Sequence, residues 1–76
     1  MRADNYVIVR KFGEKDYRWA MFFASDDDYV TKDDRYFIHI GFKTPREAAN
    51  NAQSDLDVIE YGIKFEEGCL IGDAQF

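Results

Sequence analysis

Two runs rich in β-branched and aromatic residues open the chain, at residues 6–12 and 17–24. The residues between them include Gly13 and Asp16, which favour a tight turn. Apolar side chains recur at every second position of the second run, which is typical of a strand with two distinct faces. The two runs and the turn together predict an antiparallel β-hairpin.

A third run, residues 35–42, also alternates and predicts a third strand. Tyr36, Ile38 and Ile40 share one face of this strand, and His39 lies on the other. The ten residues before it, 25–34, contain five aspartates. Aspartate is a poor strand former, so this segment is predicted to be a solvated loop.

A helix start follows at residues 44–47. Thr44 can accept a hydrogen bond from the Glu47 backbone N–H, and the Glu47 side chain can reach back to the Thr44 N–H. Pro45 stands at the first helical position, where its missing N–H is not needed. Gly62 is a suitable residue for the end of the helix. An apolar stripe at helical spacing follows the start: Ala48, Ala49, Ala52, Leu56 and Ile59.

The last pattern, residues 63–71, predicts one or two short strands. The expected order of elements is therefore β-β-β-α-β. We predict an α+β fold in which one helix packs on one face of an antiparallel sheet of three to four strands. A length of 76 residues fits a single domain, residues 1–76.

The chain is also rich in aromatic residues, with 7 Phe, 5 Tyr and 1 Trp. One helix covers only one face of a small sheet, so some of these rings must lie elsewhere. They are expected on the uncovered face, at a sheet edge, or under the C-terminal segment. Exposed aromatic patches usually mark an interface, and the candidate aromatic contacts are Trp19, Tyr29 and Phe37.

The formal net charge of −5 is unevenly distributed. Residues 25–34 carry one Lys against five Asp, and residues 51–76 carry one Lys against six acidic residues. Such a field repels nucleic acid and attracts a basic protein surface, although an acidic face also serves solubility alone. The predicted partner-binding residues are Asp26, Asp27, Asp28, Asp33, Asp34, Asp55, Asp57, Glu60, Glu66 and Glu67.

The sequence contains no recognisable catalytic, cofactor or metal motif. His39 and Cys69 are the single histidine and cysteine, too few for a structural zinc and without a catalytic arrangement around them. The aspartate-rich loop does not have the EF-hand spacing, and the glycines form no phosphate loop. We therefore predict a non-enzymatic protein without a cofactor.

The lone cysteine and the shortness of the apolar runs bear on location. A single cysteine fits a reducing compartment. The apolar runs are too short for a signal peptide or a membrane span. These features predict a cytoplasmic protein without membrane contact.

Two alternative functions stay open. Basic and aromatic residues interleave on the first hairpin, as in sheets that stack single-stranded bases, although the net negative charge disfavours direct nucleic-acid binding. The residues concerned are Tyr6, Arg10, Lys11, Arg18 and Trp19. The second alternative is a self-associating module, such as a homodimer joined through exposed aromatics or a sheet edge.

In general character the chain resembles the small phage-encoded inhibitor proteins, such as anti-CRISPR proteins. The similarity lies in the one-domain length, the acidity, the pattern of a sheet with a single helix, and the absence of catalytic motifs. Residues 41–49 join a strand to a capped helix in a way that many small domains share. The resemblance implies a protein that binds and blocks a host complex that handles nucleic acid, and it assigns no role to any residue.

Overall fold

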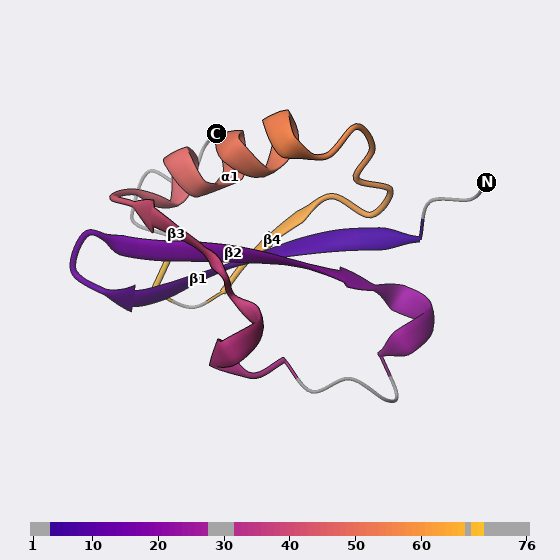
Figure 1. The fold of residues 1–76 in the computed structure, drawn as a ribbon, viewed down its shortest axis with the longest axis horizontal. Helices are drawn as coiled ribbons and strands as arrows, with labels where there is room; N and C mark the ends of the chain where they lie inside the picture. The colour runs from indigo at the N-terminus through magenta and orange to yellow at the C-terminus, as the bar shows by residue number, and fades with distance from the viewer. Residues whose placement is uncertain (1–3, 28–31, 67, 70–76) are drawn as a thin grey trace.

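The computed structural model describes residues 4–27, 32–66 and 68–69 (Figure 1). The strands are β1 (Asn5–Gly13), β2 (Asp16–Phe23), β3 (His39–Phe42) and β4 (Ile63–Phe65), and the helix is α1 (Pro45–Asp55). The strands form one sheet in the order β3-β2-β1-β4, with α1 across one face. The predicted α+β class, the order of elements and the helix on one face are confirmed.

The expectation of an antiparallel sheet is wrong for β4, which pairs in parallel with β1. β3 runs in the same direction as β1, because both strands are antiparallel to β2. The helix carries the chain back across the sheet, so β4 starts from the same end as β1 and β3 (Figure 1). A parallel pairing follows from this crossover connection, and the sheet is mixed.

The predicted hairpin of β1 and β2 is confirmed. The two strands are antiparallel, with Val7 opposite Met21 and Val9 opposite Trp19. In the turn between them Lys15 has a φ of 56°, in the left-handed region.

The predicted third strand begins four residues late, at His39. Residues 34–36 form a 3₁₀ turn, and Phe37 follows with φ −91° and ψ 76°. The Ile38 N–H bonds to the Tyr36 carbonyl at 3.1 Å, so Phe37 lies at the centre of a tight inverse γ-turn. This turn takes the chain off the sheet edge and across the face opposite the helix.

The helix begins as predicted and ends earlier than predicted. The Glu47 N–H donates to the Thr44 hydroxyl at 3.1 Å, but the Glu47 carboxylate accepts from the Lys43 N–H at 3.0 Å instead of from Thr44. The helix stops at Asp55, and the following residues have a separate role at the end of the sheet. Gly62, the expected stop, has a φ of 82° and lies just before β4 instead.

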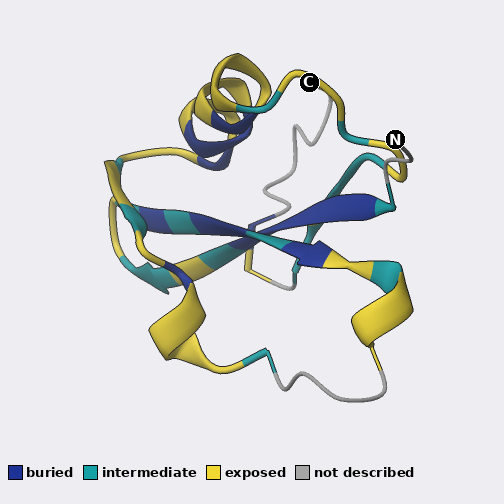
Figure 2. Cartoon of the chain, turned by 45° about the vertical axis from the view of Figure 1, so that its right-hand side comes forward, coloured by how far each residue is buried: buried dark blue, intermediate teal, exposed yellow. Residues whose placement is uncertain are grey.

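A hydrophobic cluster lies on each face of the sheet. The cluster between sheet and helix contains Val7, Val9, Tyr17, Trp19, Ala48, Ala49, Ala52 and Cys69. The cluster on the opposite face contains Tyr6, Ile8, Ala20, Phe22 and Phe37. Figure 2 shows buried positions along both central strands and on the inner side of the helix. Alanines let the helix lie close to the sheet.

The structure corrects the assignment of Trp19 and Phe37 as aromatic contacts. Trp19 is 1% exposed because it packs between the sheet and the helix. Phe37, which belongs to segment 32–38, is 2% exposed because it packs onto the opposite face of the sheet. Segment 32–38, rather than a C-terminal strand, contributes the ring that fills the second face. Rings buried in this way are not available to a partner in the folded protein.

Candidate functional site

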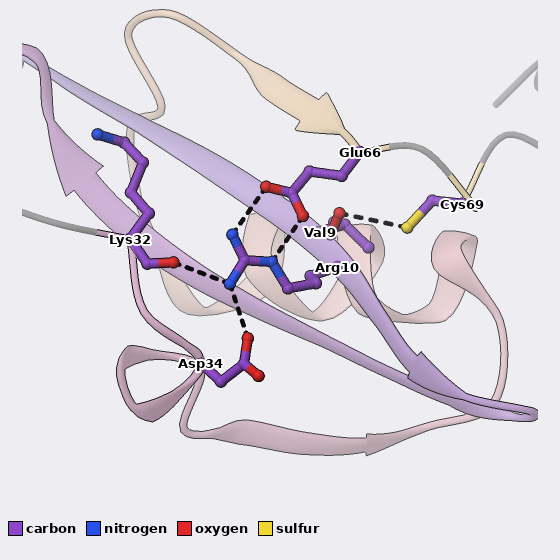
Figure 3. A network of polar contacts seen from close by, with 6 residues as sticks. All are labelled: Val9, Arg10, Lys32, Asp34, Glu66 and Cys69. Atoms are coloured by element: carbon purple, nitrogen blue, oxygen red, sulfur yellow. Dashed lines mark hydrogen bonds and ion pairs between the residues drawn. The ribbon is translucent and has the colours of Figure 1, made fainter.

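Two of the predicted acidic residues hold the fold together through Arg10 (Figure 3). The guanidinium group of Arg10 donates to both Glu66 carboxylate oxygens at 2.6 and 2.9 Å, and to Asp34 Oδ1 at 2.9 Å. It also bonds to the Lys32 carbonyl at 2.8 Å and lies 4.3 Å from the centre of the Phe37 ring. The bonds to Glu66 raise the pKa of Arg10 above its ordinary value. Asp34 and Glu66 are thus engaged internally.

Asp27 is engaged in the same way. It accepts a hydrogen bond from the Tyr6 hydroxyl at 2.6 Å, and Lys32 Nζ lies 3.3 Å from the same oxygen. The Tyr6 hydroxyl is the main cause of the lowered pKa of Asp27. Asp33 pairs with Arg35 at 3.4 Å on the surface. The contacts among Tyr6, Asp27 and Lys32 tie segment 32–37 to the sheet, whereas the Asp33–Arg35 pair lies within the segment.

Four of the predicted acidic residues, Asp26, Asp55, Asp57 and Glu60, lie at one end of the sheet. Asp4 and Asn5 draw the two acidic segments together there. The Asp4 carbonyl accepts from the Ala24 N–H at 2.8 Å, and the Asp4 side chain accepts from the Ser25 N–H at 2.9 Å. The buried Asn5 side chain donates to the Val58 carbonyl at 2.7 Å and accepts from the Glu60 N–H at 2.9 Å.

Figure 1 shows both segments at this end, one on each side of the sheet. We call it the acidic end and define it by Asp4, Phe23, Asp26, Asp55, Asp57, Val58, Glu60 and Tyr61. Within the described part of the chain, no ion pair engages the carboxylates of Asp26, Asp55, Asp57 or Glu60.

Apolar side chains are exposed among these carboxylates. Phe23 is 43% exposed, Val58 54% and Tyr61 58%. A surface that combines unpaired carboxylates with exposed apolar groups can bind a protein that carries basic and apolar side chains.

Basic residues gather at the opposite end of the molecule, which measures 35 Å along its longest axis. Lys11 and Lys15 lie at the hairpin turn, and Lys43 and Arg46 lie at the start of the helix. Figure 1 shows the hairpin turn and the helix start at the same end. Glu14, Asp16 and Glu47 lie at this end too, so it is only slightly basic, and the charge difference along the molecule comes mainly from the acidic end.

The two residues best suited to catalysis have structural roles. The His39 ring stacks on Trp19 with centres 3.7 Å apart. The buried Cys69 thiol donates to the Val9 carbonyl at 3.3 Å (Figure 3), and burial raises its pKa. Over residues 4–27, 32–66 and 68–69, no group of three potential metal ligands occurs, and no helix is long and apolar enough to cross a membrane.

The first hairpin does not present a platform for nucleic-acid bases. Tyr6 and Trp19 are both buried. Arg10 and Arg18 point their charges at carboxylates, with Arg18 paired to Asp16 at 3.1 Å. Four of the five residues that suggested base stacking, all except the exposed Lys11, therefore make contacts within the fold.

Sequence reasoning missed several residues of the acidic end. Asn5, Phe23, Val58 and Tyr61 were not singled out, although Val58 and Tyr61 are apolar residues outside the helical stripe. Three predicted residues, Asp28, Tyr29 and Glu67, lie outside the described residues.

Comparisons with protein-family models, with curated proteins and with solved structures find no match to this chain.

Proposed function

We propose that this protein is a non-enzymatic interaction protein whose acidic end binds a basic, nucleic-acid-handling protein. The observation that carries the proposal is the meeting of two acidic segments, distant in sequence, at Asp4 and Asn5. The carboxylates of Asp26, Asp55, Asp57 and Glu60 have no ion pair within the described structure, so their charge is available to a partner. The stacked His39 and the buried Cys69 also favour binding over catalysis.

The proposal includes inhibition. A partner surface that binds nucleic acid is basic, and carboxylates presented on a rigid end compete with phosphates for it. Such an inhibitor and the nucleic acid exclude each other. Added oligonucleotide is therefore expected to displace the protein from its partner.

The test is capture of partners by the tagged protein from cells that produce it, followed by binding measurements with the purified partner. We expect the Asp26→Lys/Glu60→Lys variant to bind at least about tenfold more weakly, because rim charges set electrostatic attraction. The matched control is Glu14→Lys, which reverses an exposed carboxylate at the opposite end and should leave affinity unchanged. Equal binding by all three proteins contradicts the proposal.

A second function, self-association, is favoured by the edge strand β3. Ile38 is 72% exposed and Ile40 59% exposed, both at this edge. These exposed apolar side chains favour side-chain contact with another copy. Sedimentation at micromolar concentration distinguishes the two functions, because a homodimer that Ile40→Lys disrupts supports self-association and a monomer excludes it.

A further inference from the structure

The backbone of β2 presents hydrogen-bonding groups away from β1 at two positions. The Ala24 N–H donates to the Asp4 carbonyl, and bonded pairs alternate along an antiparallel ladder. Met21 and Phe23 therefore direct their N–H and C=O groups to the far side of β2. On β1, Val7 and Asn5 lie opposite Met21 and Phe23, and their backbone groups likewise point away from the β1–β2 pair. The Val7 N–H donates to the Gly62 carbonyl, and the Asn5 carbonyl accepts from the Tyr61 N–H.

β3 does not reach this part of the edge. It pairs with β2 at Tyr17 and Trp19 alone. Preceding His39, the chain lies in the γ-turn at Phe37, which directs it across the face of the sheet. Figure 1 shows β2 continuing past β3 toward the acidic end with no further strand beside it. Among the described residues, none pairs with the outer edge of β2 beyond Trp19.

A pocket of about 170 Å³ lies beside this edge. Its lining combines apolar side chains with two carboxylates: Met21, Phe22, Phe23, Asp26, Asp27 and Tyr36. Tyr36 and Phe23 are partly exposed, 40% and 43%, so the apolar surface continues out of the pocket. Asp27 is occupied by Tyr6 and Lys32, whereas the Asp26 carboxylate has no such partner within the described structure.

We propose that a short extended segment of a basic partner adds to the sheet at this edge. Its backbone bonds to Met21 and Phe23, in the way that peptides extend exposed sheet edges. Side chains of a strand alternate, so one apolar residue enters the pocket against Phe22 and Tyr36. A flanking Lys or Arg faces Asp26. This inference rests on the proposed function and specifies how the partner is held.

Charge and geometry favour such a partner over a second copy of the chain. Two copies joined edge to edge by a two-fold axis would pair β2 with β2 in antiparallel orientation. In that pairing the chain after Phe23 of one copy runs toward Trp19 of the other, where β3 already lies. A short basic segment from another protein does not meet this obstacle, and its charge complements the Asp26 carboxylate.

The test separates the backbone of Phe23 from its side chain. Phe23→Pro removes the outward N–H and no hydrogen bond of the β1–β2 ladder, because that N–H does not bond to β1. Phe23→Ala removes the same ring and keeps the N–H, so it is the matched control. The probes are individual peptides selected on the wild-type protein from a displayed random library. Thermal unfolding of both variants checks that each is folded.

We expect the selected peptides to carry alternating apolar residues flanked by Lys or Arg. They should bind Phe23→Pro at least about fivefold more weakly than Phe23→Ala, because a backbone hydrogen bond is lost. Saturating peptide should slow hydrogen exchange at the Met21 and Phe23 amides of the wild-type protein.

Equal affinities for Phe23→Pro and Phe23→Ala would overturn the inference. So would protection of these amides by raising the concentration of the protein alone, which assigns the edge to a second copy. The proposed function is tested separately by Asp26→Lys/Glu60→Lys on the captured partner. If that variant loses the partner while Phe23→Pro and Phe23→Ala bind it equally, the function stands and the strand addition fails.

Discussion

At the scale of single residues, Arg10 connects β1 to two distant parts of the chain. From the centre of β1 it contacts Glu66 after β4, Asp34 in the 3₁₀ turn, and the ring of Phe37. These contacts come from two segments far apart in sequence, 32–38 and the residue after β4. One planar guanidinium serves all of them because its donors point in several directions within one plane.

The planar group leads to a prediction for Arg10→Lys. A lysine keeps the charge but cannot form two parallel bonds to Glu66, so the free energy of unfolding should fall by about 1 kcal/mol. Urea denaturation measures this change. Arg35→Lys is the control, because its ion pair with Asp33 lies at the surface with the Arg35 side chain 74% exposed, and it should show no measurable loss. Similar losses in both variants would contradict the special role of Arg10.

The Tyr6–Asp27 bond predicts a pH dependence. The Tyr6 hydroxyl holds the pKa of Asp27 below its ordinary value. Because the folded-state pKa is the lower one, the ionised carboxylate stabilises the fold above pH of about 4. This stabilisation is lost as the pH falls through the folded-state pKa.

In Tyr6→Phe the pKa of Asp27 should rise toward its ordinary value, and its contribution to acid unfolding should shrink. Carboxyl NMR titration measures the pKa, and unfolding between pH 2 and 6 measures the stability. An Asp27 pKa that is the same in both proteins would show that Lys32, and not Tyr6, sets it.

At the scale of elements, β3 is the least regular strand. Its pairing with β2 contains a bulge between Tyr17 and Trp19, opposite Ile40 and Gly41. Gly41 has a φ of 100°, a conformation that other residues rarely adopt. A bulged edge strand discourages continuous pairing with another sheet, which leaves the outer edge of β2 as the more regular one.

The conformation of Gly41 predicts the effect of adding a methyl group. A Cβ at Gly41 would meet no atom within 4 Å, so Gly41→Ala tests the backbone alone. It should lower the free energy of unfolding by about 1 kcal/mol. Gly13→Ala is the control, since Gly13 has no positive φ and its nearest neighbour, Asp16 Cβ, lies at an ordinary 3.8 Å. Urea denaturation should rank the two variants in this order.

At the scale of the whole molecule, the sheet is covered on both faces by different means. The helix covers one face, and segment 32–38 contributes Phe37 to the other. Cys69 belongs to the helix-side cluster and is fully buried. Access to its thiol therefore requires the sheet and its cover to separate.

This burial predicts the reactivity of Cys69. Alkylation in native buffer should be slow, because the thiol is inaccessible and its pKa is raised by burial. The rate should rise with urea in parallel with unfolding seen by tryptophan fluorescence. Rapid alkylation of the native protein would show that the chain near Cys69 opens without global unfolding.

Local patterns were sufficient for the helix start and for the first hairpin. The Thr44 cap and the following Pro45 determine the helix start, because capping depends on residues three positions apart. The hairpin of β1 and β2 also follows from a short turn between two alternating runs. The parallel pairing of β4 was implicit in the β-β-β-α-β order, since both outer strands of the three-stranded meander run the same way.

The sequence by itself determined the faces of β1 and β2, the helix start and the presence of two acidic segments, because each depends on neighbouring residues. The alternation predicted for residues 35–42 was wrong, since Phe37 packs opposite the helix while His39 stacks on Trp19 on the helix side. Only the tertiary structure decided which other parts of the chain those strands, the helix and the acidic segments contact. It buried Trp19 and Phe37, turned Asp34 and Glu66 inward onto Arg10, and joined the acidic segments at Asp4 and Asn5. Periodicity defines which side chains share a face, but contacts between distant segments decide what covers that face and which charges stay exposed.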